Sequence, residues 1–211
     1  MSDLFSFITF SALSPSMAVA WVVAIIAAYF IGNLSPASII SKAYGLDIRK
    51  EGSGNPGTTN MLRVIGKKAA LGTLLIDVAK GVVAVLIGKY TGGEALSVLC
   101  GLSVFVGHIF PALYGFKGGK GIATAFGVLL ALHPVMALIC LGIAAIGFVT
   151  ARRVSVGSLL AALCLPFLSW VYLPDYIIVF AIMAAIVFFK HRSNLQRLIK
   201  GEEPKVNFKK K

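Results

Sequence analysis

Long apolar runs almost without charged residues limit most strongly what this chain can fold into. Seven candidate segments of this kind are separated by short polar or charged connections: 17–44, 69–89, 95–116, 121–132, 135–151, 156–173 and 176–189. The hydrocarbon core of a bilayer is about 30 Å thick and needs about 17–25 apolar residues per helix. A helix also satisfies every backbone polar group within its own segment. The sequence therefore predicts an all-α polytopic membrane helix bundle.

Composition excludes a soluble domain. The chain is 58% hydrophobic and 13% charged, whereas soluble domains carry about 25% charged residues. Its 20 Lys and Arg against 8 Asp and Glu give a formal charge of +12. A soluble nucleic-acid-binding protein would need a polar surface to display such a basic patch. Nucleic acid is therefore not an expected partner.

Two of the segments are irregular. Segment 17–44 is interrupted near Asn33 to Pro36, which indicates either a kink or the lining of a cavity. Segment 121–132 is too short to cross a bilayer alone, and His133-Pro134 is either a turn between two spans or a kink in one tilted helix. We favour the turn, because a kink would place the basic residues 152–153 on the opposite side from the other basic loops.

Basic residues occur in every second connection. Cytoplasmic loops carry the excess of Lys and Arg. We therefore expect a single domain, 1–211, with seven transmembrane helices, the N-terminus outside and the C-terminus cytoplasmic. The expected cytoplasmic parts are loops 46–68, 116–121 and 152–156 and the tail 190–211. Positive-inside topology and attraction to anionic lipid explain several of the charges without a site: Arg49, Lys50, Arg152, Arg153 and Lys209 to Lys211.

The longest basic connection has the composition of an anion-binding loop. It contains GSGNPGTTNMLR, from Gly52 to Arg63. Glycines let backbone N–H groups approach an anion, the hydroxyl and amide side chains add donors, and arginine binds phosphate oxygens bidentately. A flexible surface loop is the alternative interpretation. The G-x-G-x-x-G spacing at 52–57 is not a dinucleotide site, since no strand–helix unit surrounds it.

A second glycine-rich cluster, GHIFPALYGFKGGKG, covers residues 107–121. It is not a Walker A loop, because Gly121 stands where Ser or Thr is required. Lys120 follows two glycines and is expected to head a helix with exposed backbone donors, where the helix dipole favours an anion. Lys117 is explained by topology, and His108 is either a buried hydrogen-bonding residue or a site residue.

Five further polar residues lie at three places in the sequence. Ser155 follows a basic pair and is either a neutral donor or a helix N-cap. His191 and Asn194 are spaced i, i+3 on one face of a helix that is expected to continue past the last span, where binding of anionic lipid is an equal alternative. Asp77 and Lys80 have the same spacing inside a span, and we favour a structural ion pair over a direct role in a site.

Together, GSGNPGTTNMLR, GHIFPALYGFKGGKG and KHRSNLQRL, with DVAKG at 77–81, resemble the bacterial membrane acyltransferases that use acyl phosphate to acylate glycerol 3-phosphate. The resemblance covers nearly the whole chain. It implies transfer of a fatty acyl group to the 1-hydroxyl of glycerol 3-phosphate, giving lysophosphatidic acid and phosphate, the first acylation of phospholipid synthesis. It also implies a multi-pass protein of the bacterial inner membrane, surrounded by membrane lipids, with its active site at the cytoplasmic face. We expect a monomer without a cofactor or a bound metal.

The resemblance also implies the site residues. The implied catalytic residues are Ser53, Arg63, Lys120, Ser155, His191 and Asn194. The implied substrate-binding residues are Gly54, Asn55, Thr58, Thr59, Asn60, His108, Gly118 and Gly119.

Direct transfer of the acyl group is the expected mechanism. The chain has no G-x-S-x-G nucleophile motif, and none of its three histidines is followed by Asp five residues later. Acyl phosphate is already activated, so positioning and charge stabilisation are expected to provide most of the catalysis. The proton acceptor is either the departing phosphate or His191. A transporter or flippase for an anionic phosphate-bearing solute or lipid is the alternative function, disfavoured because no inverted repeat is evident and the basic clusters lie on one side.

Overall fold

The computed structural model describes residues 14–205, whose regular secondary structure is helical without a strand. The expected outer N-terminal residues 1–13 and the end of the basic tail, 206–211, lie outside the described range. The all-α membrane architecture is confirmed for the described residues: four helices are long and apolar enough to cross a membrane, or five if a bent pair counts as one span. Seven crossings and the orientation of the termini stay predictions. The chain divides into two compact units, Met1–Leu132 and His133–Lys211, which are described separately.

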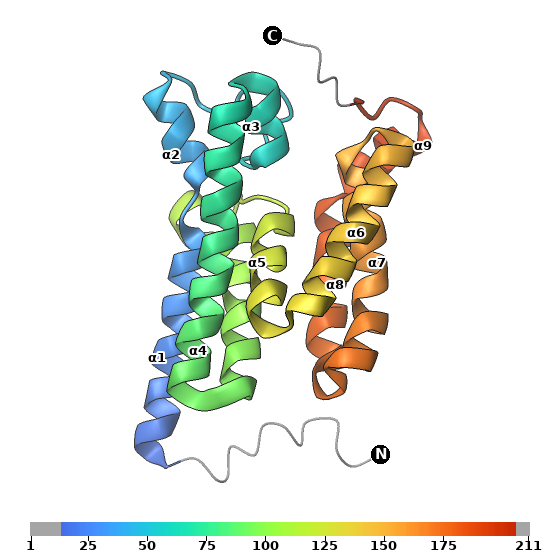
Figure 1. The fold of residues 1–211 in the computed structure, drawn as a ribbon. Coiled ribbons are helices and arrows are strands. Elements are labelled where there is room, and N and C mark those ends of the chain that lie inside the picture. The colour runs from blue at the N-terminus through green and yellow to red at the C-terminus, as the bar shows by residue number, and fades with distance from the viewer. Residues whose placement is uncertain (1–13, 206–211) are drawn as a thin grey trace. The chain divides into compact units, whose positions relative to one another are not determined.

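The first unit contains five α-helices and a short 3-10 turn within the described residues (Figure 1). In chain order they are α1 (Pro15–Asn33), α2 (Pro36–Ala43), α3 (Thr58–Val64), α4 (Lys67–Ile109), η2 (Ala112–Tyr114) and α5 (Ile122–Leu132). The hydroxyl of Ser14 caps α1 by accepting a hydrogen bond from the backbone N–H of Met17 at 3.3 Å.

The predicted interruption of segment 17–44 is confirmed. Helix α1 ends at Asn33 and α2 begins at Pro36, whose ring removes a backbone donor and disfavours a helical conformation in the preceding residue. Gly32 lies so close to the backbone of α4 that a Cβ there would overlap the carbonyl oxygen of Val104. The hydroxyl of Tyr29 reinforces this contact by donating to the carbonyl of Phe110 at 2.7 Å.

Helix α4 is two helical arms joined at Gly92–Gly93. Gly93 has a φ of +76°, a conformation that glycine adopts without steric cost, and the chain reverses direction there (Figure 1). The arms correspond to the predicted segments 69–89 and 95–116, although the second arm ends at Ile109.

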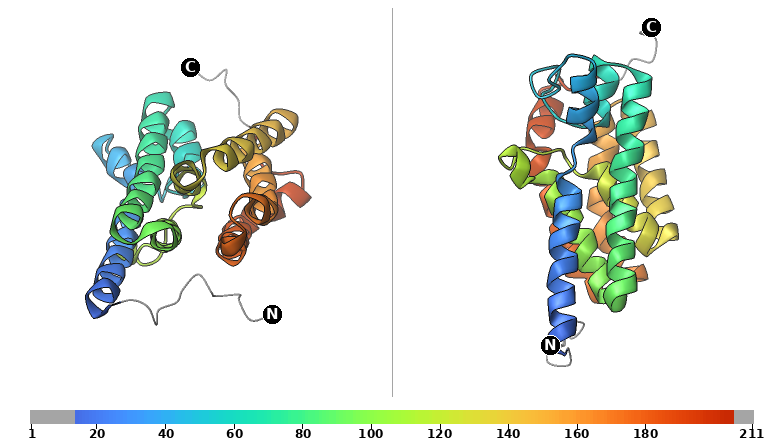
Figure 2. Two further views of the ribbon diagram at one scale, coloured as in Figure 1. Left: turned by 60° about the horizontal axis from the view of Figure 1, so that its bottom comes forward. Right: turned by 90° about the vertical axis from the view of Figure 1, so that its left-hand side faces the viewer.

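The core of the first unit lies where α1, α4 and α5 pack together (Figure 2). Trp21 and Ala28 of α1 meet Val85 and Val104 of α4 and Val128 of α5 there. This packing places the end of α1, the end of α4 and the loop before α5 side by side.

The described part of the second unit is built from three long helices, a 3-10 turn and a short last helix. Its elements are α6 (Pro134–Ala151), α7 (Val154–Tyr172), η3 (Pro174–Tyr176), α8 (Ile177–Lys190) and α9 (Arg192–Ile199). A helix boundary lies at His133, between α5 and α6, and the turn between two membrane spans at this point stays a prediction.

The expectation that the last helix continues through His191 and Asn194 is wrong. Helices α8 and α9 meet at His191 and are bent by 57°. The bend accompanies a contact with the tail, because Asn194 turns toward Glu203 and donates a hydrogen bond to its carboxylate at 2.6 Å.

Candidate functional site

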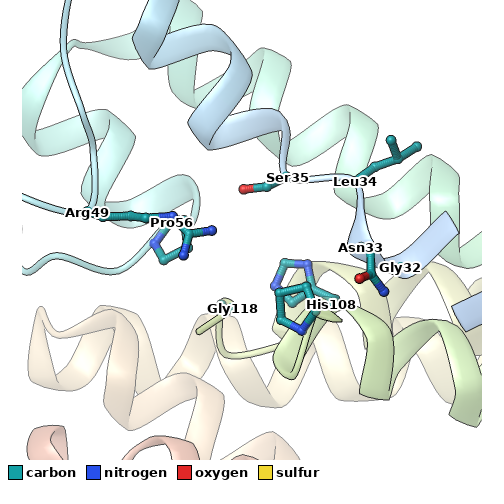
Figure 3. A pocket seen from close by; sticks show the side chains of 10 residues that line it. Gly32, Asn33, Leu34, Ser35, Arg49, Pro56, His108 and Gly118 are labelled. Atoms are coloured by element: carbon teal, nitrogen blue, oxygen red, sulfur yellow. The ribbon is translucent and has the colours of Figure 1, made fainter. Parts of the chain in front are cut away.

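A small pocket opens where α1 is interrupted, entirely within the first unit (Figure 3). Its lining consists of Gly32, Asn33, Leu34, Ser35, Arg49, Pro56, His108, Pro111, Gly118 and Gly119. The break between α1 and α2 is therefore both a kink and a cavity lining, the two alternatives that the sequence left open.

A buried polar cluster supports one side of this pocket. The Nζ of Lys80 lies 2.8 Å from the Oδ1 of Asp77 and 2.7 Å from the Nδ1 of His108. It also donates to the carbonyls of Gly32 at 3.1 Å and Leu34 at 2.8 Å, both in the break of α1. The predicted Asp77–Lys80 ion pair is confirmed, and it ties α4 to the pocket wall.

The same contacts orient the ring of His108. The Nδ1 of His108 lies 2.7 Å from the Nζ of Lys80 and 3.3 Å from the Oδ1 of Asp77, so it accepts from the ammonium group or, when it carries a proton, donates to the carboxylate. The Nε2 of the same ring lies against the glycine-rich loop, because a Cβ on Gly119 would overlap it. His108 is thus both a buried hydrogen-bonding residue and a pocket residue.

The glycine-rich loop is anchored by its own backbone donors. The N–H of Gly118 donates to the carbonyl of Ile109, and the N–H of Gly119 to that of His108, both at 3.2 Å. The expectation of exposed backbone donors is therefore wrong for these two glycines, whose N–H groups are used to close the loop onto α4. Lys120 lies half-buried two residues before the first residue of α5.

Asn60 organises the loop before α3 from within. Its side chain is 1% exposed, and its amide donates to the carbonyls of Ile48 at 3.3 Å and Glu51 at 2.9 Å. Its Oδ1 accepts from the N–H of Ser53 at 3.0 Å. Asn60, expected to bind substrate, therefore uses its amide to hold the loop in shape.

The pocket gathers only part of the predicted set in this unit. Of those residues, His108, Gly118 and Gly119 line it. The side chains of Ser53 and Arg63 are exposed, and four other predicted residues are partly buried outside the lining: Gly54, Asn55, Thr58 and Thr59.

Sequence reasoning missed Arg49, which lines the pocket. Its guanidinium donates to the carbonyl of Lys117 and to the Oγ of Ser38, and lies over the ring of Tyr114. The topological explanation of its charge is therefore incomplete. The only sequence signal that Arg49 lines a pocket was its position just before the glycine-rich loop that begins at Gly52.

In the second unit, the carboxylate of Glu203 joins two predicted site residues. Its Oε1 accepts from the hydroxyl of Ser155 at 2.8 Å and from the amide of Asn194 at 2.6 Å, and its Oε2 accepts from the Nε of Arg197 at 2.7 Å. The N-cap of α7 is Arg153, so the N-cap alternative for Ser155 is wrong. Its hydroxyl donates to Glu203 here, and its role as a donor to a bound anion stays a prediction. The only sequence signal for this role of Glu203 was that an acidic residue occurs in a basic tail.

His191 lies at the bend between α8 and α9 and is 2% exposed. Its Nδ1 lies 2.8 Å from the carbonyl oxygen of Val187. A carbonyl can only accept, so Nδ1 carries the proton and the Nε2 of a neutral ring carries a lone pair. A histidine that acts as a general base through Nε2 needs this tautomer.

Glu203 gives the second unit a pH-dependent stability. Burial alone would raise its pKa, but hydrogen bonds from Asn194, Ser155 and Arg197 and the charge of Arg197 outweigh burial and lower the pKa below its ordinary value. The ionised carboxylate therefore stabilises the fold above the ordinary pKa, and this contribution is lost as pH falls through the lower folded value.

Replacing Glu203 with glutamine is expected to lower stability by about 1–3 kcal/mol at neutral pH. The difference from the unmodified protein should shrink as the pH falls through the folded pKa of Glu203. Thermal unfolding of the purified protein in micelles, followed across the acidic range, measures this, with exposed Glu202→Gln as the matched control. A difference that is constant with pH would contradict the role of the carboxylate.

Comparison with known proteins extends to nearly the whole chain. A family model for glycerol-3-phosphate acyltransferases matches residues 22–201. A glycerol-3-phosphate acyltransferase of Neisseria meningitidis is 44% identical over 200 residues, which are 88% of this chain and 97% of that protein. The enzyme of Clostridioides difficile is 40% identical over 201 residues, 90% and 97% of the two chains.

Solved structures agree with this assignment. The crystal structure of PlsY, an integral membrane glycerol 3-phosphate acyltransferase, in its glycerol 3-phosphate form has a TM-score of 0.85 at 32% identity and covers 89% of this chain and 96% of that chain. Its lysophosphatidic acid form has a TM-score of 0.82, also at 32% identity, over 89% and 95% of the two chains. The predicted family is thereby confirmed, and the chain belongs to the integral membrane glycerol-3-phosphate acyltransferases of phospholipid biosynthesis.

Proposed function

We propose that this protein transfers a fatty acyl group from acyl phosphate to the 1-hydroxyl of glycerol 3-phosphate, giving lysophosphatidic acid and inorganic phosphate. One observation carries the proposal: PlsY, which resembles this chain over 89% of its length, is known in a glycerol 3-phosphate form and in a lysophosphatidic acid form. These are the acceptor and the product of the proposed reaction. Acyl phosphate as donor comes from the motif resemblance.

The proposed reaction is a direct transfer. The acceptor oxygen bonds to the acyl carbon, the bond from that carbon to the phosphate oxygen breaks, and phosphate leaves with the proton of the hydroxyl. Ser155 is a poor candidate for an acyl-enzyme nucleophile. Its hydroxyl donates to Glu203, and the lowered pKa of that carboxyl makes it a weak base.

The proposal includes the predicted topology. Seven crossings would be supplied by α1 with α2, the two arms of α4, and α5, α6, α7 and α8. A single domain, 1–211, would then carry its phosphate-binding residues at the cytoplasmic face, and the acyl tail would lie among apolar helices or lipid.

The choice of donor tests the proposal. Purified protein in detergent micelles is expected to form lysophosphatidic acid from glycerol 3-phosphate and acyl phosphate, with EDTA present throughout and without any gradient. Acyl-coenzyme A and acyl carrier protein thioesters should give no product above the blank. Equal turnover with a thioester would contradict the donor assignment. Absence of turnover together with gradient-dependent uptake into liposomes would favour the transporter.

His191→Ala tests the source of the base. We expect the departing phosphate to accept the proton, so the variant should keep the shape of the pH–rate profile even if its rate falls. A general base normally contributes about 10²–10⁴-fold, so loss of the acidic limb with a decrease of that size would instead assign the role to His191. His133→Ala, which removes the side-chain cap of α6, controls for lost stability in the same unit. Labelled acyl group trapped on the protein would contradict direct transfer.

A further inference from the structure

Arg49 is held in the pocket by contacts from separate segments. Its Nη1 donates to the carbonyl of Lys117, and its Nε donates to the Oγ of Ser38 at 3.4 Å. The guanidinium carbon lies 4.6 Å from the centre of the Tyr114 ring, within the range of a cation–π contact. The guanidinium is therefore fixed in place beside Pro56 and the glycine-rich loop (Figure 3).

One nitrogen of this fixed guanidinium has no acceptor. The Nη2 of Arg49 is buried and has no hydrogen-bond partner among residues 14–205. Arginine cannot lose its charge, so the two N–H groups of a permanent cation are removed from water. Native proteins pair nearly all buried polar groups, and an exception calls for an explanation.

Among the described residues, no acceptor of the pocket pairs with this nitrogen, and several already accept from another donor. The carbonyls of Gly32 and Leu34 already accept from Lys80. The Oδ1 of Asn33 accepts from the N–H of Leu113 at 3.1 Å, and the hydroxyl of Ser35 donates to Ser38 at 2.9 Å. The carboxylate of Asp77, next to the pocket, is paired with Lys80 and does not neutralise Arg49.

The charge of Arg49 therefore has no counterpart in the lining, whose 10 residues include no carboxylate. A buried cation with two unpaired N–H groups, in a lining without a carboxylate, is suited to an oxyanion. Arginine binds phosphate oxygens with strong, charge-assisted hydrogen bonds.

We propose that the Nη2 of Arg49 binds an oxygen of a substrate phosphoryl group in this pocket. The inference rests on the proposed function, in which both substrates carry phosphate. The phosphoryl group belongs either to glycerol 3-phosphate or to acyl phosphate, and the arms of the experiment distinguish them. Arg49 is thereby a substrate-binding residue in addition to those implied by the motifs.

The experiment compares Arg49→Gln and Arg49→Lys with Lys50→Gln, which removes the same charge from the exposed neighbouring residue. Equilibrium binding of glycerol 3-phosphate and of inorganic phosphate is measured in micelles, together with the KM for each substrate. A hydrogen bond to a charged group corresponds to about a 10- to 100-fold change in affinity. We expect a loss of this size in Arg49→Gln, partial recovery in Arg49→Lys, and a change below about twofold in Lys50→Gln.

The kinetic arms identify the source of the phosphoryl group. A raised KM for glycerol 3-phosphate alone assigns its phosphate to Arg49, and a raised KM for acyl phosphate alone assigns the donor phosphate. Unchanged binding and unchanged KM values in Arg49→Gln, with only thermal stability or kcat lowered, would show that Arg49 is a clamp between loops and would overturn the inference.

A second measurement on the unmodified protein covers the case in which Arg49→Gln fails to fold. Phenylglyoxal modification, followed by peptide mass spectrometry, should be slowed at Arg49 by inorganic phosphate or glycerol 3-phosphate, with exposed Arg152 as the internal control. Equal rates at Arg49 with and without these anions would overturn the inference.

The two proposals fail in different ways. Normal acyl transfer with an unaffected Arg49→Gln variant removes this inference alone. Phosphate binding that depends on Arg49 in a protein without acyl transfer removes the proposed function alone.

Discussion

Lys80→Met is expected to destabilise the protein by about 3–5 kcal/mol, the usual cost of removing one partner from a buried ion pair. Asp77 is 2% exposed and would keep a charge without its ammonium partner. The carbonyls of Gly32 and Leu34 would also lose their donor in the break of α1. Unfolding by SDS in mixed micelles measures the change.

Exposed Lys89→Met, on the same arm of α4, is the matched control and should change stability by less than about 1 kcal/mol. The double variant Asp77→Asn with Lys80→Met removes the lone charge, and we expect it to be more stable than Lys80→Met alone. Equal stability of Lys80→Met and Lys89→Met would show that the buried pair does not hold α1 to α4.

Gly118→Ala is expected to lower kcat/KM for acyl transfer by about 10²-fold, the effect of a displacement of about 1 Å in a positioned site. A Cβ on Gly118 would overlap the carbonyl oxygens of His108 and Ile109. These are backbone atoms at the end of α4, so the loop must move away from α4 and the pocket lining must change. Initial rates at varied substrate concentration measure the change.

Gly142→Ala is the control, because a Cβ there would meet nothing within 4 Å. Gly119→Ala gives an intermediate case, since its Cβ would meet the side chain of His108 and not the backbone. Activity of Gly118→Ala within twofold of Gly142→Ala would mean that the loop does not position a substrate.

Most helices and the interruptions near Pro36 and Gly92–Gly93 could be predicted from the sequence because they depend on local properties. Apolar length determines a membrane helix, and Pro36 and Gly92–Gly93 break helices through their own backbone geometry. The Asp77–Lys80 pair could be predicted for the same reason, since i, i+3 residues are neighbours on any helix.

The contacts missed at the sequence level join distant segments. Arg49 enters the pocket only because residues 32–35 and 117–119 fold beside it. Likewise, the bend at His191 goes with the contact between Asn194 and Glu203, which lies beyond α9. The local sequence shows that such a residue is charged. Its partner lies in a distant part of the sequence, so the contact cannot be predicted from the local pattern.

The contacts of Lys80 also determine where along α1 the helix can be interrupted. Two carbonyls without helical donors, inside an apolar bundle, need a donor at their own depth, and Lys80 supplies it to Gly32 and Leu34. Each residue of a helix advances it by about 100° and 1.5 Å. A single residue inserted into α1 would therefore rotate these carbonyls away from Lys80, so the ion pair fixes the register of α1 against α4.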